Sequence, residues 1–411
     1  MSTLQMLEEL YWDKADFRPA ELDYYKLLAN HVVTTLLKEV QSNARPGDPK
    51  ISLKPIGTGS SFEGVKVKPE LEFDFMVPLK ITWEQIIFSD KDPNIPVCCG
   101  LIQIEKPRTM LMELLLLFES MWAKNSDFKK KFCINLGRHG RVLSSGKIQQ
   151  WFQSMCNYIK PTLSAHFLGV TFTFKKTGPA MTLVFKWHGK KMKIDIVLAI
   201  QYTQGAYLVP KKSSQTEETA WRLSFSTVEK AFFNSLTPNS CYLKCLKILK
   251  YLTENGKKID TNSKLPSSCS SYYLKTAFVH QVLQIDKRAW QNQHLESRVR
   301  GLLRYLVKCM EQRHLPHIFA GNKELEGRSD SWLRGVPRKF FRFKEANLLS
   351  EVDQHTLDEI ENRLTYILDN FDEVLRLMIK DSMPFPAEVC QKYRLLHSFM
   401  KFFSKIEDSK W

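Results

Sequence analysis

A change of texture along the chain is the feature that most limits its fold. Short β-rich runs alternate with helical segments from Ile51 to Gln201, whereas strand signals nearly vanish after Trp221. Alternating strands and helices predict a mixed sheet packed against helices, and the helical continuation predicts a second layer. The sequence therefore predicts an α+β chain of two lobes, with a boundary near residues 205–220.

Hydrophobic periodicity predicts the individual elements. A long helix is expected over 22–40, after a short lead-in at 1–20. Strands are expected at 51–56, 70–79, 170–174, 181–187 and 192–200. Further helices are expected at 110–126, 147–159, 228–235, 242–253, 272–285, 296–312, 356–370 and 371–380. The expected domains are 1–215, 216–370 with a basic insert at 321–345, and a helical extension at 371–411.

Charge and cysteine content narrow the class of protein. Among 411 residues, 60 Lys and Arg against 44 Asp and Glu leave a formal charge of +16. Such an excess favours an anionic partner, which could be nucleic acid, nucleotide or acidic membrane. The start of the chain does not read as a signal peptide, and the apolar run at 110–118 is too short to cross a bilayer. Nine scattered cysteines suggest a reducing compartment, so we expect a soluble, cytoplasmic protein without a membrane.

A glycine turn and two acids form the most informative motif. Residues 56–64 read Ile-Gly-Thr-Gly-Ser-Ser-Phe-Glu-Gly, and a Gly-Ser turn after a strand lets backbone amides approach phosphate oxygens. Glu72 and Asp74 follow shortly afterwards. Residues two apart in a strand share a face, so Phe73 and Phe75 should point into the core while both acids point away from it.

A third acid completes the pattern. Asp195 lies in a second predicted strand, between the inward-facing Ile194 and Ile196. Carboxylates that lie together need a cation between them, and Mg²⁺ binds through carboxylates plus substrate phosphates. Either signal alone is weak, since Glu-x-Asp on a strand is usually a solvated face. Their combination in one α/β segment favours a nucleotidyltransferase.

Later segments extend this pattern into a family resemblance. They are Trp221–Ser226 followed by Glu229, then Cys241–Leu252, then Ser270–Phe278. With the turn and the acids, they resemble the cyclic GMP-AMP synthases and synthase-like receptors, an active branch of the male-abnormal (Mab) nucleotidyltransferases. The resemblance spans about residues 20–370, with a gap near 321–345. It implies a bilobed nucleotidyltransferase fold, with a catalytic lobe of mixed sheet and spine helix, and an all-helical second lobe.

The resemblance also implies roles for the acids and the phosphate-binding residues. Glu72, Asp74 and Asp195 would be catalytic and would hold two Mg²⁺ or Mn²⁺ ions. The residues that grip or flank donor phosphates would be Ser60, Lys250, Ser271 and Lys275.

A second group of residues would recognise bases and acceptor groups. The resemblance implies that Tyr272 stacks on a base. The side that reads the acceptor and donor would be lined by Thr58, Arg222, Ser224, Ser226 and Glu229. Without the resemblance, each of these residues has an ordinary alternative, such as a core aromatic or a surface base.

The sequence departs from the vertebrate synthases at their zinc thumb. Residues 230–240, where the thumb would lie, contain neither His nor Cys. Cys241 and Cys245 alone cannot make a tetrahedral site, so no structural zinc is expected. The missing thumb argues against DNA recognition of the vertebrate kind, and several synthase-like receptors respond to double-stranded RNA instead.

Basic clusters offer a surface for such a duplex, although each could also be a solvated face. They lie at 129–131, 175–176, 190–193, 211–212, 257–258 and 334–344. An RNA duplex would be read through its shape, phosphates and 2′-hydroxyls.

The leading hypothesis is an enzyme of innate immune sensing that is activated by nucleic acid. It would make a cyclic dinucleotide such as cGAMP from ATP and GTP, release pyrophosphate and signal to a downstream cyclic-dinucleotide receptor. Double-stranded RNA is favoured as the activator, a DNA-activated synthase is an alternative, and dimerisation on the ligand is left open. Two rivals remain: a catalytically silent protein that binds nucleotide or duplex, and a synthase of linear products.

Overall fold

The computed structural model describes most of the chain. The described residues are 1–16, 19–67, 70–81, 85–88, 91, 95, 98–104, 126–187, 189–211, 218–255 and 270–380. The helix expected at 110–126 lies almost entirely outside them, as do the basic pair 257–258 and the extension after residue 380.

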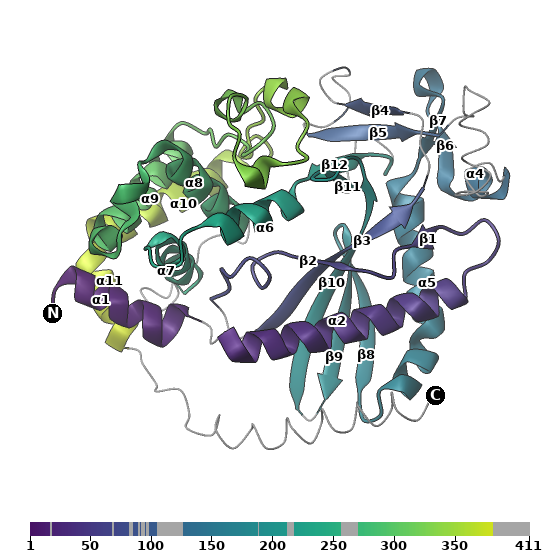
Figure 1. Cartoon of the computed structure of the whole chain (residues 1–411), viewed down its shortest axis with the longest axis horizontal. Helices are drawn as coiled ribbons and strands as arrows, with labels where there is room; N and C mark the ends of the chain where they lie inside the picture. Colours follow the sequence, from purple (N-terminus) through teal and green to yellow (C-terminus); the bar gives the residue numbers. More distant parts are fainter. Residues whose placement is uncertain are drawn as a thin grey trace.

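A mixed sheet organises the first half of the described chain (Figure 1). Its long strands are β3 (Leu71–Lys80), β8 (Thr171–Thr177), β9 (Ala180–Trp187) and β10 (Lys190–Gln201). Its short strands are β1 (Lys50–Ile51), β2 (Ile56–Thr58), β4 (Gln85–Phe88), β5 (Cys99–Gln103), β6 (Cys133–Asn135), β7 (Arg141–Leu143), β11 (Tyr207–Pro210) and β12 (Trp221–Ser224). The order β1-β3-β10-β11-β12-β5-β7-β6 combines parallel and antiparallel pairs, which confirms the predicted mixed sheet.

The centre of the sheet follows the predicted alternation. Phe73 and Phe75 on β3, and Ile194 and Ile196 on β10, are at most 1% exposed. These apolar side chains occupy one face, because successive residues of a strand point to opposite sides. The core of the lobe therefore lies on the face opposite the predicted acids.

Two helices pack against each other beside this sheet (Figure 1). They are α2 (Pro19–Ser42), which matches the expected spine helix, and α5 (Ser145–His166). Val32, Val33 and Leu36 of α2 are fully buried, because they lie on its single apolar stripe. The short α4 (Ser126–Phe132) precedes β6.

The second half of the chain is helical, as predicted (Figure 1). It contains α6 (Ser226–Ser235), α7 (Tyr242–Glu254), α8 (Ser271–Gln284), α9 (Leu295–Glu311), α10 (Gln354–Asp369) and α11 (Phe371–Lys380). Trp290 packs its ring against Tyr242 and Phe278 and holds α7 and α8 together. Among the described helices, none has the length and apolar character needed to cross a membrane.

The first sixteen residues differ from the expected lead-in. They form α1 (Thr3–Leu10) and a π-helical turn, Tyr11–Ala15, and α1 packs against α9 and α11 (Figure 1). Met6, Leu7 and Leu10 are buried there, and Lys247 of α7 binds Asp16 at 2.6 Å. The expectation of a short lead-in was wrong because an eight-residue helix gives little periodicity and depends on tertiary packing.

The insert at 321–345 is also more than a basic surface. Phe340 is fully buried, and its ring contacts Phe88 of β4 and Phe225, the residue before α6. Thr203 donates a hydrogen bond to the Gly335 carbonyl. The insert therefore fastens the helical lobe to the sheet, while its charged side chains, such as Arg334 and Lys344, stay exposed.

Candidate functional site

Two predicted acids meet on neighbouring strands. β3 and β10 are parallel and paired in register, which makes Asp74 the partner of Asp195 and Glu72 the partner of Lys193. Partnered residues of adjacent strands point to the same face of a sheet. Asp74 and Asp195 are therefore close neighbours, although 121 positions of sequence separate them.

Asp74 lies in an environment that disfavours its charge. Burial, followed by the negative charge of Asp195, raises the pKa of Asp74 to about 6. The hydroxyl of Thr182 donates to Asp195, which satisfies one oxygen of that carboxylate. The positive charge of Lys66 opposes this rise only in part, so the two adjacent carboxylates form a site at which a further cation is stabilised.

Glu72 lies two residues before Asp74 on β3 and is already paired with a lysine. Its carboxylate accepts from Lys193, and its backbone carbonyl accepts from Ser61 at 2.7 Å and Lys66 at 3.2 Å. Within the described residues, no group of three or more His, Cys, Asp or Glu is arranged to hold a metal ion. The Asp74–Asp195 pair nevertheless fits Mg²⁺ or Mn²⁺, since two carboxylates and ligand oxygens can complete such a site. Glu72 could join only by leaving Lys193.

The glycine turn packs directly onto the acid pair. Gly59 has a φ of +74°, and a Cβ there would lie 2.2 Å from Oδ2 of Asp74, so no side chain fits. The amides of Phe62 and Glu63 both donate to the Gly59 carbonyl. The neighbouring hydroxyls have different settings: Ser61 is buried and bonded to Glu72, whereas Ser60 is partly exposed.

A cavity of about 770 Å³ opens beside this turn and lies between the sheet and the helical lobe. Its volume is within the range of small-molecule sites. The predicted residues that line it are Thr58, Asp74, Arg222, Ser224, Ser226, Glu229, Tyr272 and Lys275. The predicted residues outside its lining are Ser60, Glu72, Asp195, Lys250 and Ser271.

A buried charge network spans one wall of the cavity. Lys275 of α8 contacts Glu63 of the glycine turn at 3.1 Å and Glu229 of α6 at 2.5 Å. Burial alone would lower the pKa of Lys275, but the two carboxylates outweigh it and raise the pKa. The Tyr272 hydroxyl also donates to Glu229, at 3.1 Å. Glu63 was not predicted, because nothing in the sequence indicates a contact across 212 positions.

Lys250 and Ser271 have structural contacts of their own. Lys250 is 6% exposed and donates to the Val65 carbonyl at 2.9 Å, and burial lowers its pKa to about 8. It therefore joins α7 to the segment after the glycine turn. Ser271 is exposed in the first turn of α8, next to Ser270, whose hydroxyl caps that helix.

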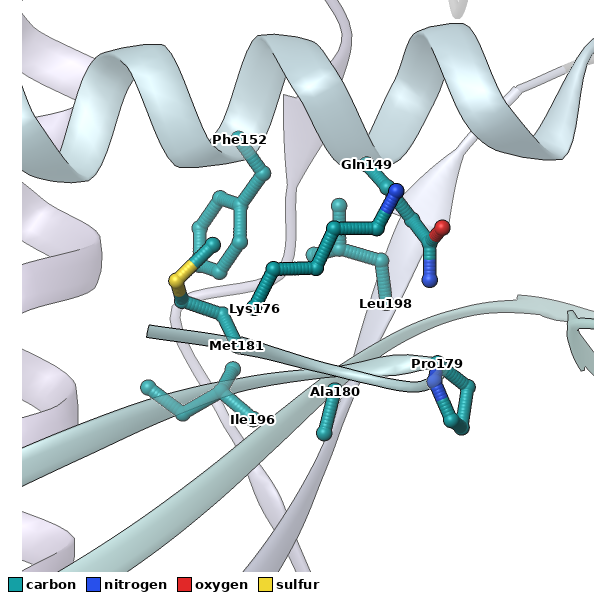
Figure 2. A pocket seen from close by; sticks show the side chains of 8 residues that line it. All are labelled: Gln149, Phe152, Lys176, Pro179, Ala180, Met181, Ile196 and Leu198. Carbon is teal, nitrogen blue, oxygen red and sulfur yellow. The ribbon is translucent and has the colours of Figure 1, made fainter. Parts of the chain in front are cut away.

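A second, much smaller cavity lies between α5 and the sheet (Figure 2). Its volume is about 10 Å³, which is about what one water molecule needs. Figure 2 shows the apolar side chains of Phe152, Met181, Ile196 and Leu198 around it, together with the polar side chains of Gln149 and Lys176. We interpret it as a packing gap rather than a binding site.

The large cavity, of about 770 Å³, also has lining residues that the sequence did not indicate. Besides Glu63, they include Cys98, His317 and Asn347. All four lie outside the helices and strands, where periodicity gives no signal. The described cysteines are all buried, free thiols, and these include Cys241 and Cys245.

Comparison with protein families places the site in context. Residues 61–235 match the model described as the Mab-21 protein nucleotidyltransferase domain, and residues 241–330 match the Mab-21 protein HhH/H2TH-like domain. The first match contains all three acids, and the second contains Lys250, Tyr272 and Lys275. Both matched segments contribute residues that line the cavity.

Individual proteins that resemble this chain include receptor-interacting proteins and a cyclic GMP-AMP synthase. The inositol 1,4,5-trisphosphate receptor-interacting protein of Danio rerio is 29% identical over 300 residues, which cover 66% of this chain and 54% of that protein. The inositol 1,4,5-trisphosphate receptor-interacting protein-like 1 of Rattus norvegicus is 28% identical over 295 residues, which cover 66% of this chain and 52% of the rat protein. The cyclic GMP-AMP synthase of Sus scrofa is 26% identical over 367 residues, which cover 77% of this chain and 66% of that synthase. The chain thus spans about half the length of the two receptor-interacting proteins.

Proposed function

This chain belongs to the Mab-21 family, and from that membership we propose that it is a nucleotidyltransferase that makes a cyclic dinucleotide from ATP and GTP. The segment 1–215 would be the catalytic lobe, and 216–370 would be the helical lobe that closes over the nucleotides. The proposed setting is cytoplasmic innate immune sensing, with a downstream receptor for the product.

The observation that carries this proposal is the Asp74–Asp195 pair beside Gly59. Carboxylates from two strands, a glycine turn without room for a side chain, and a cavity of about 770 Å³ adjoin one another. Mg²⁺ or Mn²⁺, when bound by Asp74, Asp195 and Glu72, would neutralise triphosphate charge and activate a ribose hydroxyl. This combination suits transfer of a nucleotidyl group with release of pyrophosphate.

The remaining residues would bind and orient the two nucleotides. Lys275 and Arg222 supply positive charge at the cavity wall, and the Ser224 and Ser226 hydroxyls lie 3.2 Å from each other. The ring of Tyr272 offers a flat surface for a base, while its hydroxyl is held by Glu229. Such fixed groups orient a substrate without reorganising during the reaction.

Activation would act on the glycine turn. Glu63 ties this turn to Lys275, and Lys250 ties the following residues to α7. Lys275 can bind phosphate only if it releases one of its carboxylates. We propose that double-stranded RNA, bound on basic clusters such as 129–131 and Lys190 and Lys191 with Lys193, shifts the turn and frees this lysine. DNA is the alternative activator, and dimerisation on the duplex is compatible with this scheme.

The test is a product assay with a matched pair of variants. The full chain is incubated with ATP, GTP and Mg²⁺ or Mn²⁺, with and without RNA and DNA duplexes. We expect a phosphatase-resistant product, and we expect D74N to lower its rate at least about a hundredfold. E70Q changes an exposed acid just before β3 and should retain full activity. Absence of any product with every duplex would overturn the proposal.

The arrangement of Glu72 favours a rival. Its carboxylate is paired with Lys193, and Lys275 is held between two acids. These contacts suit a protein that binds a nucleotide or duplex and signals without chemistry. If so, D74N would leave signalling intact in cells. A phosphatase-sensitive product would instead indicate a linear oligonucleotide.

A further inference from the structure

His317 presents one fixed hydrogen-bond donor at the cavity. Its Nδ1 accepts from the backbone amides of Phe319 and Ala320, both at 3.0 Å. An imidazole nitrogen that accepts two N–H groups carries no proton, so the proton of the neutral ring lies on Nε2. The turn at 317–320 therefore sets both the tautomer and the direction of the ring.

The ring is held in its neutral form. Burial lowers the pKa of His317 to about 4, although the nearby carboxylate of Glu229 opposes this shift. Near neutral pH, Nε2 can consequently donate a hydrogen bond but cannot accept one. Within the described part of the chain, Nε2 has no hydrogen-bond partner, and His317 is among the residues that line the cavity.

The surroundings of His317 suit a flat ligand. Its ring centroid lies 6.5 Å from that of Tyr272, and Phe225 and Phe319 support it at 6.0 and 6.2 Å. Tyr272 is itself fixed through its hydroxyl to Glu229. A planar ring placed against Tyr272 would therefore lie close to the donor of His317.

We propose that His317 selects the nucleobase at this part of the cavity by donating from Nε2 to a keto oxygen. This inference rests on the proposed function. Guanine and uracil present a keto oxygen where adenine and cytosine present an amino group. An amino group at this position would place a second hydrogen-bond donor against the Nε2 donor, so neither group would have an acceptor. The site therefore prefers guanine or uracil to adenine or cytosine.

Equilibrium binding tests this preference without requiring catalysis. The probes are the α,β-methylene analogues of GTP, UTP, ATP and CTP with Mg²⁺, measured by calorimetry on the full chain. We expect the wild type to bind a keto analogue about tenfold more tightly than the amino analogue of the same ring class. H317N replaces Nδ1 with an amide oxygen that can accept from Phe319 and Ala320, but it has no group at the position of Nε2. This variant should keep the melting temperature and lose the preference.

Two further variants make the result specific. H317Q places an amide group near the position of Nε2 and should retain part of the preference. H314N changes a histidine that contacts Glu345 and is not among the cavity-lining residues, so it should leave the preference unchanged. The inference is overturned if the wild type binds no analogue, if it binds keto and amino analogues equally, or if H317N keeps the full preference. An intact keto preference without any product would count against the proposed function alone.

Discussion

The two walls of the cavity differ in how they accommodate buried charge. On the sheet wall, Asp74 lines the cavity and has Asp195 as its partner on the neighbouring strand, and the pKa of Asp74 is raised. On the helical wall, Lys275 lies between Glu63 and Glu229, so opposite charges compensate one another. The sheet wall is thus stabilised by an added cation, whereas the charges of the helical wall are already paired, so Lys275 must release a carboxylate before it can bind an anion.

Removing the central cation of the helical wall should have the largest effect on stability. The side chains of Glu63, Glu229 and Lys275 are only 1%, 7% and 13% exposed. K275M would leave two carboxylates buried together, and we expect it to lower the free energy of unfolding by about 3–5 kcal/mol. Denaturant titration of the purified chain measures this.

Two controls sharpen that comparison. K26M removes a partly exposed lysine paired with the exposed Asp23 and should change stability by less than about 1 kcal/mol. The double variant E63Q/K275M should recover part of the loss, because only one carboxylate then remains charged. If the K275M protein were as stable as the K26M protein, the loss of Lys275 would not destabilise the two buried carboxylates, and the prediction would be wrong.

On the sheet wall, removing a charged group should raise the stability of the protein rather than lower it. D74N removes a charge from the acid pair, so we expect the metal-free protein to gain about 2 kcal/mol at pH 7. The pKa of Asp74 is raised from 3.8 to about 6, so its contribution to stability is fully present below about pH 4 and is lost as the pH rises through about 6. The advantage of D74N should therefore develop between pH 4 and 6 and persist above it.

Thermal melts of both proteins in chelator, from pH 4 to 8, measure that difference. E70Q is the matched control and should follow the wild type, since Glu70 is exposed. A D74N protein that is less stable than the wild type at pH 7, or an advantage that does not vary with pH, would contradict the account of a strained acid pair.

The two walls also differ in how far the sequence predicts them. The acids of the sheet wall follow from strand alternation, because Glu72 and Asp74 lie two apart and Asp195 sits between two isoleucines. The sequence could not predict that Asp195 pairs with Asp74 rather than with a neighbour, since alternation alone does not set the register. Nor could it predict that Glu72 bonds Lys193, because this depends on that register.

The helical wall depends on contacts that no local pattern carries. The long helices were predicted, and α7 begins at the expected residue. Glu63 and His317 were missed because their roles come from the approach of segments distant in sequence. The short strands β4 to β7 were missed too, since three to five residues give little alternation to recognise.

The smallest predicted effect compares two lysines one turn apart on α7. Lys250 is buried, donates to a backbone carbonyl, and has a pKa lowered to about 8, whereas Lys247 is paired with Asp16. K250M should raise the free energy of unfolding by about 1 kcal/mol at pH 7, while K247M should lower it. Because the folded pKa of Lys250 lies below the unfolded value of 10.5, the wild type should gain stability between about pH 8 and 10.5, and K250M should lack that gain.

Denaturant titrations at pH 7 and 10 measure both differences. Equal losses in the two variants would mean that the Lys250 contact with Val65 outweighs the burial of its charge.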